Sequence, residues 1–314
     1  MITQPDPTVP TNTPVAPLTG LALTDPRAAS RPALVVKVDN ADTSGAHARP
    51  QAGLVAADVV FEQLVEGGIT RLVAVFQSQV PGPVGPVRSA RTTDPPLVGQ
   101  LNRPLFAWSG GNGGVIAAVR AGPLIDVGFA ATPSAYYRHG GRRAPHNLFV
   151  HPSQLYRRSP QGSGPPSPLF RFRPAGQPLA PTSEAVRGVR LDFGGVASAP
   201  VTYEYDAATD GWRRRQSGSI HVDADGTAVA PRNVLVLFTR YRPSPADARS
   251  PEAQSVGTGQ AWVFSKGGLV RGTWSRTALD RPADLRDSTG RVIELTPGKT
   301  WVELPKEGQA AVLW

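Results

Sequence analysis

Glycine and proline interrupt this chain so often that long regular helices have little room. The sequence contains 33 glycines and 33 prolines among 314 residues. Proline breaks a helix and glycine weakens one, whereas both are common in tight turns. The chain therefore favours many short strands joined by turns over a helical bundle. Apolar residues make up 40% of the chain and charged residues 18%, so these elements can bury a core.

The first half of the chain predicts an α/β domain with a mixed sheet. Residues 33–38 form a short β-branched run that ends in the polar pair Asp39 and Asn40. Residues 59–66 and 69–76 flank a glycine pair in the pattern of a hairpin. A short strand near residues 104–108 is followed by a glycine-rich loop. Short helices are predicted at residues 53–58, 93–101, 115–121 and 152–156.

The second half changes to strands and turns, which predicts a mostly antiparallel β region packed against the first. The fold class is therefore α+β, and the chain divides into four parts. These are a disordered tether (1–16), an N-terminal α/β domain carrying the site (17–160), a linker (161–168) and a β-rich C-terminal domain (169–314). The candidate C-terminal strands are 201–205, 211–215, 234–241, 260–264, 269–274, 292–295 and 300–304.

Composition excludes several classes of protein. The chain has no cysteine, which rules out disulfides, thiolate metal sites and a cysteine nucleophile. The net charge of +9 is spread as +4 over residues 1–157 and +5 over the remainder, so we expect no nucleic-acid partner. No apolar run of about 18 residues is present, so no membrane-spanning helix is predicted.

The first 16 residues are rich in proline and threonine, a composition typical of a tether. Such a tether commonly follows a removed signal or a lipidated anchor. We therefore expect an extracytoplasmic protein of the cell envelope whose signal or anchor precedes Met1. Peripheral membrane association would arise only through that removed or missing anchor.

The densest polar cluster is VGPVRSARTTD, residues 84–94, in which a Gly/Pro turn delivers two arginines. Two further polar stretches, 62–71 and 137–147, are expected to meet it. Arginine recognises carboxylate and phosphate groups through a fork of N–H donors. The three stretches predict one pocket for an anionic or polyhydroxylated ligand. Its predicted ligand-binding residues are Asn40, Arg71, Arg88, Ser89, Arg91, Asp94, His139, Arg143 and Asn147.

Four residues are candidates for acid/base chemistry in this pocket: Glu62, Glu66, Asp39 and His146. On a strand of period two, Glu62 and Glu66 share a face with Cα atoms about 13 Å apart. That separation exceeds a typical retaining glycosidase pair, although side chains can converge. The histidine spacing does not match a metalloprotease motif, and we predict neither a metal nor another cofactor.

A structural interpretation competes with the catalytic one. The glutamates and aspartates could pair with the arginines in a buried network that fixes loop geometry. On the residues alone, either glutamate could be an ion-pair partner rather than a catalytic group.

Several motifs together resemble a known family. They are RPALVVKVDN (31–40), ARPQAGL (48–54), ADVVFE (57–62), VEGGITR (65–71), VGPVRSAR (84–91), RAPHNL (143–148), GTW (272–274) and LTPGKTWVE (295–303). They resemble the YerB-like family of bacterial envelope lipoproteins, whose function is unknown. The resemblance implies a two-domain, exported and often lipid-anchored protein, but it supplies no reaction. This chain departs from the family in lacking the lipobox cysteine.

The leading hypothesis is an envelope protein that binds an anionic or carbohydrate polymer, with hydrolysis of that polymer left open as a second activity. Its partner would be an envelope polysaccharide or another anionic polymer, and any enzymatic activity would be a glycan-directed hydrolysis. The alternative is a non-catalytic scaffold or adaptor that contacts an envelope protein and whose Arg/Glu cluster is structural.

Overall fold

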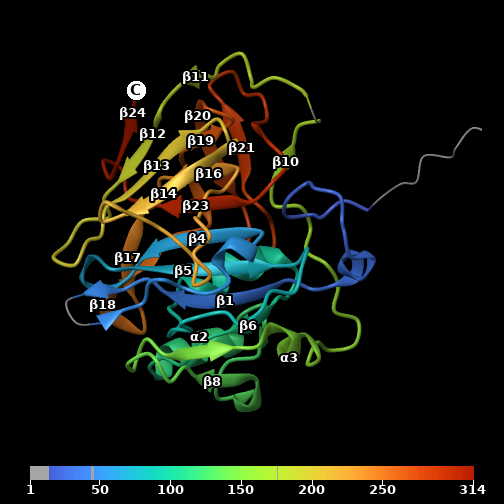
Figure 1. Ribbon diagram of the computed structural model, residues 1–314, viewed down its shortest axis with the longest axis vertical. Coiled ribbons are helices and arrows are strands. Elements are labelled where there is room, and N and C mark those ends of the chain that lie inside the picture. The colour runs from blue at the N-terminus through green and yellow to red at the C-terminus, as the bar shows by residue number, and fades with distance from the viewer. Residues whose placement is uncertain (1–13, 44–45, 175) are drawn as a thin grey trace, which may run out of the picture.

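One mixed sheet runs through both halves of the chain (Figure 1). The computed structural model describes residues 14–43, 46–174 and 176–314. In the described residues the sheet has eleven strands, of which β21 (Asp284–Asp287) pairs only with β20. The other strands, in spatial order, are β11 (Glu184–Ala185), β20 (Gly268–Arg276), β19 (Gly257–Ser265), β16 (Asn233–Leu237), β23 (Thr300–Leu304), β4 (Val59–Leu64), β5 (Thr70–Phe76), β1 (Leu34–Asp39), β6 (Leu105–Ala107) and β7 (Ile125–Asp126).

The two halves join where β23 pairs in parallel with β4, placing Glu303 beside Glu62. On one side of this junction β16 is parallel to β23, and on the other β1 runs antiparallel to β5, which is antiparallel to β4. Strands β16, β23, β4 and β1 therefore end at the same edge of the sheet, toward the left of Figure 1. Polar groups that follow these strands gather at that edge.

Both faces of the central strands are buried, because β1, β4 and β5 are covered above and below. Alternate residues enter opposite cores: Val60 and Leu72 lie in one, Val59 and Val73 in the other. A five-stranded antiparallel sheet supplies much of the first core. Its order is β15 (Ser219–Ile220), β14 (Gly211–Gln216), β13 (Val201–Asp206), β12 (Gly188–Leu191) and β24 (Ala310–Leu313).

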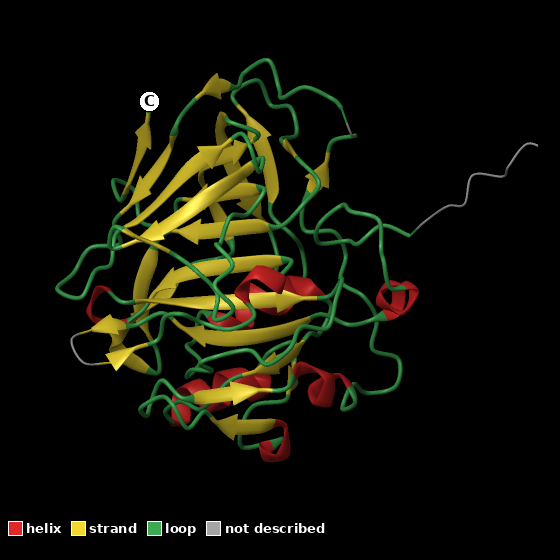
Figure 2. Ribbon diagram, in the orientation of Figure 1, coloured by secondary structure: helices red, strands yellow, loops and turns green. Residues whose placement is uncertain are grey.

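The helices are few and short, and Figure 2 shows them in the lower half of the molecule. Helices α1 (Asp94–Val98) and α2 (Gly113–Ala121) cover the second core through Leu97 and Val119. The remaining α-helix is α3 (Pro152–Tyr156). The 3-10 turns are η1 (Pro26–Ser30), η2 (Leu54–Ala56), η3 (Glu66–Gly68), η4 (Gly99–Leu101) and η5 (Pro133–Ala135).

Four small two-stranded ribbons complete the described fold. They are β2 (Asp42–Thr43) with β3 (Ala46–His47), β8 (Tyr136–Arg138) with β9 (Leu148–Val150), β10 (Arg171–Phe172) with β22 (Glu294–Leu295), and β17 (Tyr241–Ser244) with β18 (Asp247–Ala253). The β17–β18 ribbon crosses from the C-terminal half to the N-terminal half. There Ser250 donates to Glu66 at 2.5 Å and the Ala253 N–H donates to Thr93 at 3.0 Å.

The coarse prediction of a mixed sheet with antiparallel β structure is confirmed, and the hairpin is β4–β5. The predicted helix at 93–101 is α1 followed by the 3-10 turn η4, and the one at 53–58 is only the turn η2. Most of the predicted tether lies outside the described residues. Its last three residues are ordered, because Val15 pairs with Ala22 and Ala16 is buried. The boundaries at 160 and 168 stay a prediction.

Candidate anion-binding site

The central stretch, residues 84–94, lies between β1 and β9. The Asp39 N–H donates to the Pro86 carbonyl at 2.9 Å, and the Arg88 N–H donates to the Lys37 carbonyl at 2.8 Å. On its other side the Val87 N–H donates to the Leu148 carbonyl at 2.6 Å. Backbone hydrogen bonds thus tie the central stretch to β1 on one side and to the start of β9 on the other.

Asp39 holds two cationic or basic groups at the end of β1. Its side chain is 1% exposed, and its Oδ2 lies 2.9 Å from Arg88 Nε and 2.7 Å from His146 Nδ1. A carboxylate accepts hydrogen bonds, so the His146 Nδ1 carries the donated proton. The other ring nitrogen of His146 has no hydrogen bond within the described structure, and the side chain is 7% exposed. Asp39 therefore acts as a positioning group for Arg88 and His146.

Arg71 lies beside Asp39, since the two are cross-strand partners in the β1–β5 ladder. Its Nη1 donates to the Ser89 carbonyl at 2.8 Å, and its buried Nε has no hydrogen-bond partner in the described structure. Burial, followed by the nearby charges of Arg91 and Arg88, lowers the pKa of Arg71 to about 10. The three guanidinium groups are thus close enough to repel one another, and an anion would relieve that repulsion.

Arg91 and Glu66 form a two-pronged ion pair. Arg91 Nε and Nη2 donate to the two Glu66 oxygens at 2.6 Å each. Partial burial opposes the charge on Glu66, but hydrogen bonds from Arg91 and Ser250 outweigh it and lower its pKa to about 2. Glu66 is consequently a carboxylate at neutral pH and has no proton to give as a general acid.

Asp94, predicted to bind ligand, is 0% exposed and lies within the scaffold. Its Oδ1 accepts from Lys37 Nζ and from Gln63 Nε2, each at 2.7 Å, and its Oδ2 accepts from the Arg91 N–H at 2.7 Å. Burial lowers the pKa of Lys37 to about 8 despite the attraction of Asp94. A ligand cannot reach Asp94 in this arrangement. The aspartate instead fixes the loop that presents Arg91.

Glu62 and Asn40 lie on the opposite face of the sheet, because they alternate with Gln63 and Asp39 along β4 and β1. Glu62 is 0% exposed and accepts from Thr70 and Asn40. Its other oxygen lies 2.6 Å from Nη2 of Arg214, which is also sealed from solvent. The two predicted glutamates are therefore separated by the sheet, since the chain leaves β4 at Leu64 and places Glu66 in the turn η3.

Hydrogen bonds close a ring around Glu62. Arg214 donates to His221 Nδ1, so the other ring nitrogen donates to Gln51 Oε1 at 2.8 Å. Gln51 donates to Asn40 Oδ1 at 3.1 Å, and Asn40 donates back to Glu62 at 3.0 Å. Burial, and then Arg214, lowers the pKa of His221 well below its usual value. The ring ties the N-terminal half to the C-terminal half through neutral His221.

Glu303 is a second buried carboxyl beside Glu62. It is 0% exposed, and Tyr203 donates to its Oε1 at 2.6 Å. Burial, and then the neighbouring Glu62, raises the pKa of Glu303 well above its usual value. Glu303 Oε2 has no donor in the described structure, as expected for a protonated oxygen directed at Glu62. This part of the network fits the structural interpretation.

The predicted residues of the β8–β9 loop lie at the surface. His139 is exposed, with its ring tilted against Phe149 at 5.5 Å between centroids, and Arg143 is exposed. The Asn147 side-chain oxygen accepts from Arg138 at 2.7 Å. Of this loop, His146 joins Asp39. Among the described residues, no group of three His, Cys, Asp or Glu side chains is arranged to hold a metal, and no helix is long and apolar enough to span a membrane.

Sequence reasoning missed Lys37, Gln51, Arg214, His221 and Glu303. One signal was available: Trp212, Arg214 and Gln216 alternate along β14 and all face inward. An arginine at such an inward position requires a buried anion.

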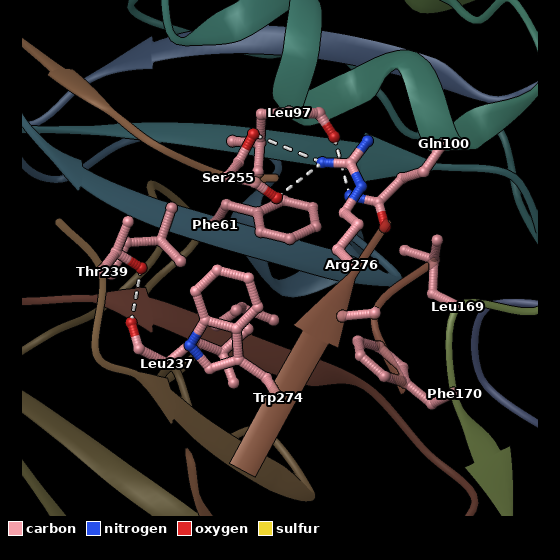
Figure 3. Close-up of a pocket in the computed structure, with 13 residues that line it drawn as sticks. Phe61, Leu97, Gln100, Leu169, Phe170, Leu237, Thr239, Ser255, Trp274 and Arg276 are labelled. Atoms are coloured by element: carbon pink, nitrogen blue, oxygen red, sulfur yellow. Dashed lines mark hydrogen bonds between the residues drawn. The ribbon is translucent and has the colours of Figure 1, made fainter. Parts of the chain in front are cut away.

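A separate cavity of about 40 Å³ lies between the two halves (Figure 3). Phe61, Leu97 and Trp274 line it, and Arg276 reaches across to Ser255 and to the Pro96 carbonyl of α1. This volume holds roughly one or two water molecules. The cavity is therefore a packing gap at the junction rather than a site for a polymer.

Comparison with known proteins agrees with the sequence motifs. Residues 18–163 match the family described as "Protein of unknown function (DUF3048) N-terminal domain", and residues 189–302 match its C-terminal domain. The chain is 29% identical over 306 residues to "Putative lipoprotein YerB" of Bacillus subtilis (strain 168), covering 94% of this chain and 87% of that protein. The crystal structure of YerB from Bacillus subtilis matches with a TM-score of 0.81 and 28% identity, over 95% of this chain and 99% of that one. The chain therefore belongs to the DUF3048 family, as its motifs predicted, and carries both of the family's domains.

Proposed function

We propose that this protein binds an anionic polymer of the cell envelope through Arg71, Arg88 and Arg91. The observation that carries the proposal is the excess of guanidinium groups at one sheet edge. Three arginines face two carboxylates, Asp39 and Glu66, while Lys37 and Asp94 neutralise each other. Arg71 also keeps a buried N–H without a partner in the described structure.

The accessible groups support binding rather than hydrolysis. Glu62 is sealed and paired with Arg214, and Glu66 is held ionised by Arg91. The remaining acid/base candidates, Asp39 and His146, are hydrogen-bonded to each other beside Arg88. This arrangement suits a binding site in which Arg88 and Arg91 contact anionic groups and the other ring nitrogen of His146 accepts one hydrogen bond.

The name of the Bacillus subtilis relative, a lipoprotein, supports an envelope location for this chain. Envelope polymers commonly carry phosphate or carboxylate groups, which match the arginine fork. The predicted alternative, a structural scaffold, is supported for the sealed Glu62–Arg214 network and for the buried Lys37–Asp94 pair.

The test is a binding screen with a matched charge control. Purified protein is titrated with poly(glycerol phosphate), polygalacturonate and neutral dextran. The polymers are then recovered, and their chain lengths are measured to detect any cleavage. Arg88→Gln removes one guanidinium that is 24% exposed, and Arg286→Gln removes a half-exposed one on β21. We expect binding of the charged polymers only, without cleavage, weakened by the first variant and not by the second. Equal binding of all three polymers, or no binding, would refute the proposal.

A further inference from the structure

A second cationic surface lies at the same sheet edge, in the C-terminal half. It is a groove of about 710 Å³ where β16 and β23 end, lined by Arg240, Tyr241, Arg242, Gln260 and Lys306 among others. Arg240 and Arg242 follow β16, and Lys306 follows β23. Because β16, β23, β4 and β1 end together, this groove lies at the same edge as Arg71 and Arg88. Its Phe238 and Gln260 side chains alternate with Leu237 and Ala261, so the groove opens on the face of the sheet opposite to Arg71.

The cations of this groove are exposed, and none of them forms an ion pair within the described part of the chain. This differs from exposed arginines elsewhere, such as Arg213 with Asp206 and Arg286 with Asp284. Glu252 lies opposite Arg242 in the β17–β18 ladder, but its carboxylate accepts from Gln254 at 3.3 Å. Glu307 is the carboxylate that lines the groove, so the groove carries an excess of positive charge.

Tyr241 gives the groove a fixed aromatic wall. Its hydroxyl accepts from the Leu64 N–H at 3.2 Å and donates to the Leu304 carbonyl at 2.7 Å. The ring is thereby pinned to the ends of β4 and β23, and Lys306 Nζ lies 5.8 Å from its centre. A fixed aromatic face beside cations and the Gln260 amide suits a ligand that has both charges and hydroxyl-bearing carbon units.

The groove and the arginine cluster are physically connected. Tyr241 starts the β17–β18 ribbon, and Ser250 of that ribbon contacts Glu66, the partner of Arg91. Four strand spacings separate β16 from β1, which corresponds to about 20 Å along the edge. A single phosphate or carboxylate cannot span that distance, whereas a chain of repeating units can.

We propose that the Arg240–Arg242–Lys306 groove is a second subsite for a linear, hydroxylated polyanion that also occupies the Arg71–Arg88–Arg91 cluster. This inference rests on the proposed function, which it extends by naming the ligand as a polymer of several charged units. Two subsites on one edge bind a linked ligand more tightly than either binds a single unit.

The experiment compares ligand lengths in two sets of variants. Glycerol phosphate and poly(glycerol phosphate) of increasing length are titrated into the full chain, with polygalacturonate fragments as the carboxylate counterpart. The variants are Arg240→Gln/Lys306→Gln for the groove, Arg88→Gln for the cluster and Arg286→Gln as the charge control. All substituted side chains are at least partly exposed, and urea unfolding verifies that each variant folds.

We expect the groove variant to weaken the long chains by about tenfold or more and to leave glycerol phosphate unaffected. Long chains that bind the groove variant as tightly as wild type would overturn the second subsite and leave the proposed function intact. Long chains weakened by the groove variant but not by Arg88→Gln would instead overturn the proposed function and retain the groove. If the protein binds only the phosphate chains, the ligand's charged group is a phosphate; if it binds both polymers, either phosphate or carboxylate is accepted. Both results support the subsite.

Discussion

The neutral state of Glu303 can be tested with an isosteric substitution. Glu303 and Glu62 lie side by side on β23 and β4, both sealed from solvent, with the single cation Arg214 paired to Glu62. In Glu303→Gln the amide oxygen accepts from Tyr203 and the amide nitrogen donates to Glu62, as the protonated acid does. We expect a cost within about 1 kcal/mol in the free energy of unfolding at pH 5.

The pH dependence gives the sharper result. An unfolded chain releases the proton of a glutamic acid above a pKa of about 4.3, whereas the folded chain retains it on Glu303 because burial raises the pKa. The folded state then binds more protons, so this residue makes stability fall as pH rises, by about 1.4 kcal/mol per pH unit. From pH 5 to 7 the wild-type protein should therefore lose stability relative to Glu303→Gln for as long as the folded protein keeps this proton.

The assay is urea unfolding followed by tryptophan fluorescence at pH 5, 6 and 7, since Trp212 and Trp301 lie in the core beside this network. Arg214→Met is the contrasting variant. It removes the cation that pairs with fully buried Glu62, which should cost about 3–5 kcal/mol at pH 7. Parallel pH profiles for wild type and Glu303→Gln would refute the protonated Glu303.

Two further predictions concern the other face of the sheet. Lys37→Met removes the cation that pairs with fully buried Asp94 and should lower the free energy of unfolding by about 3–5 kcal/mol. Urea unfolding measures this change, and an unchanged urea midpoint would contradict the Lys37–Asp94 pair. Glu66→Gln removes the carboxylate that neutralises Arg91 and should raise the affinity for poly(glycerol phosphate) by about twofold to fivefold, a change of roughly 0.5–1 kcal/mol. Weaker binding by Glu66→Gln in a calorimetric titration would mean that Glu66 itself contacts the ligand.

The convergence of Asp39, Arg88 and His146 was predictable because each follows a short strand or a Gly/Pro turn. Polar residues at such positions gather at a sheet edge. The prediction that Glu62 and Glu66 share one face of a strand was wrong, because Glu66 lies beyond the end of β4. Strand alternation ends at Leu64, and Gly67 adopts a φ of 69° in the turn that carries Glu66 away. The predicted strand ended two residues later than β4 does, and those two residues decide whether Glu66 lies on the same face as Glu62.

The partners of Glu62 were out of reach for a different reason. Its contacts with Arg214 and Glu303 depend on the parallel pairing of β4 with β23 and on a second sheet packed over that junction. Local patterns predict strands but not which distant strand pairs with which. The sequence patterns predicted two separate halves, whereas one sheet runs through both. For the same reason they assigned Glu62 to the pocket, although its partners Arg214 and Glu303 lie in the C-terminal half.

The most direct test of the proposed binding role is the salt dependence of polyanion binding in wild type and Arg88→Gln. Calorimetric titration with poly(glycerol phosphate) from about 50 to 300 mM salt reports how many phosphate contacts release counterions. We predict saturable wild-type binding that weakens with salt, and a variant that binds at least about fivefold less tightly with a shallower salt slope. Identical affinities and slopes for the two proteins, or no saturable binding at the lowest salt, would contradict an anion site at Arg71, Arg88 and Arg91.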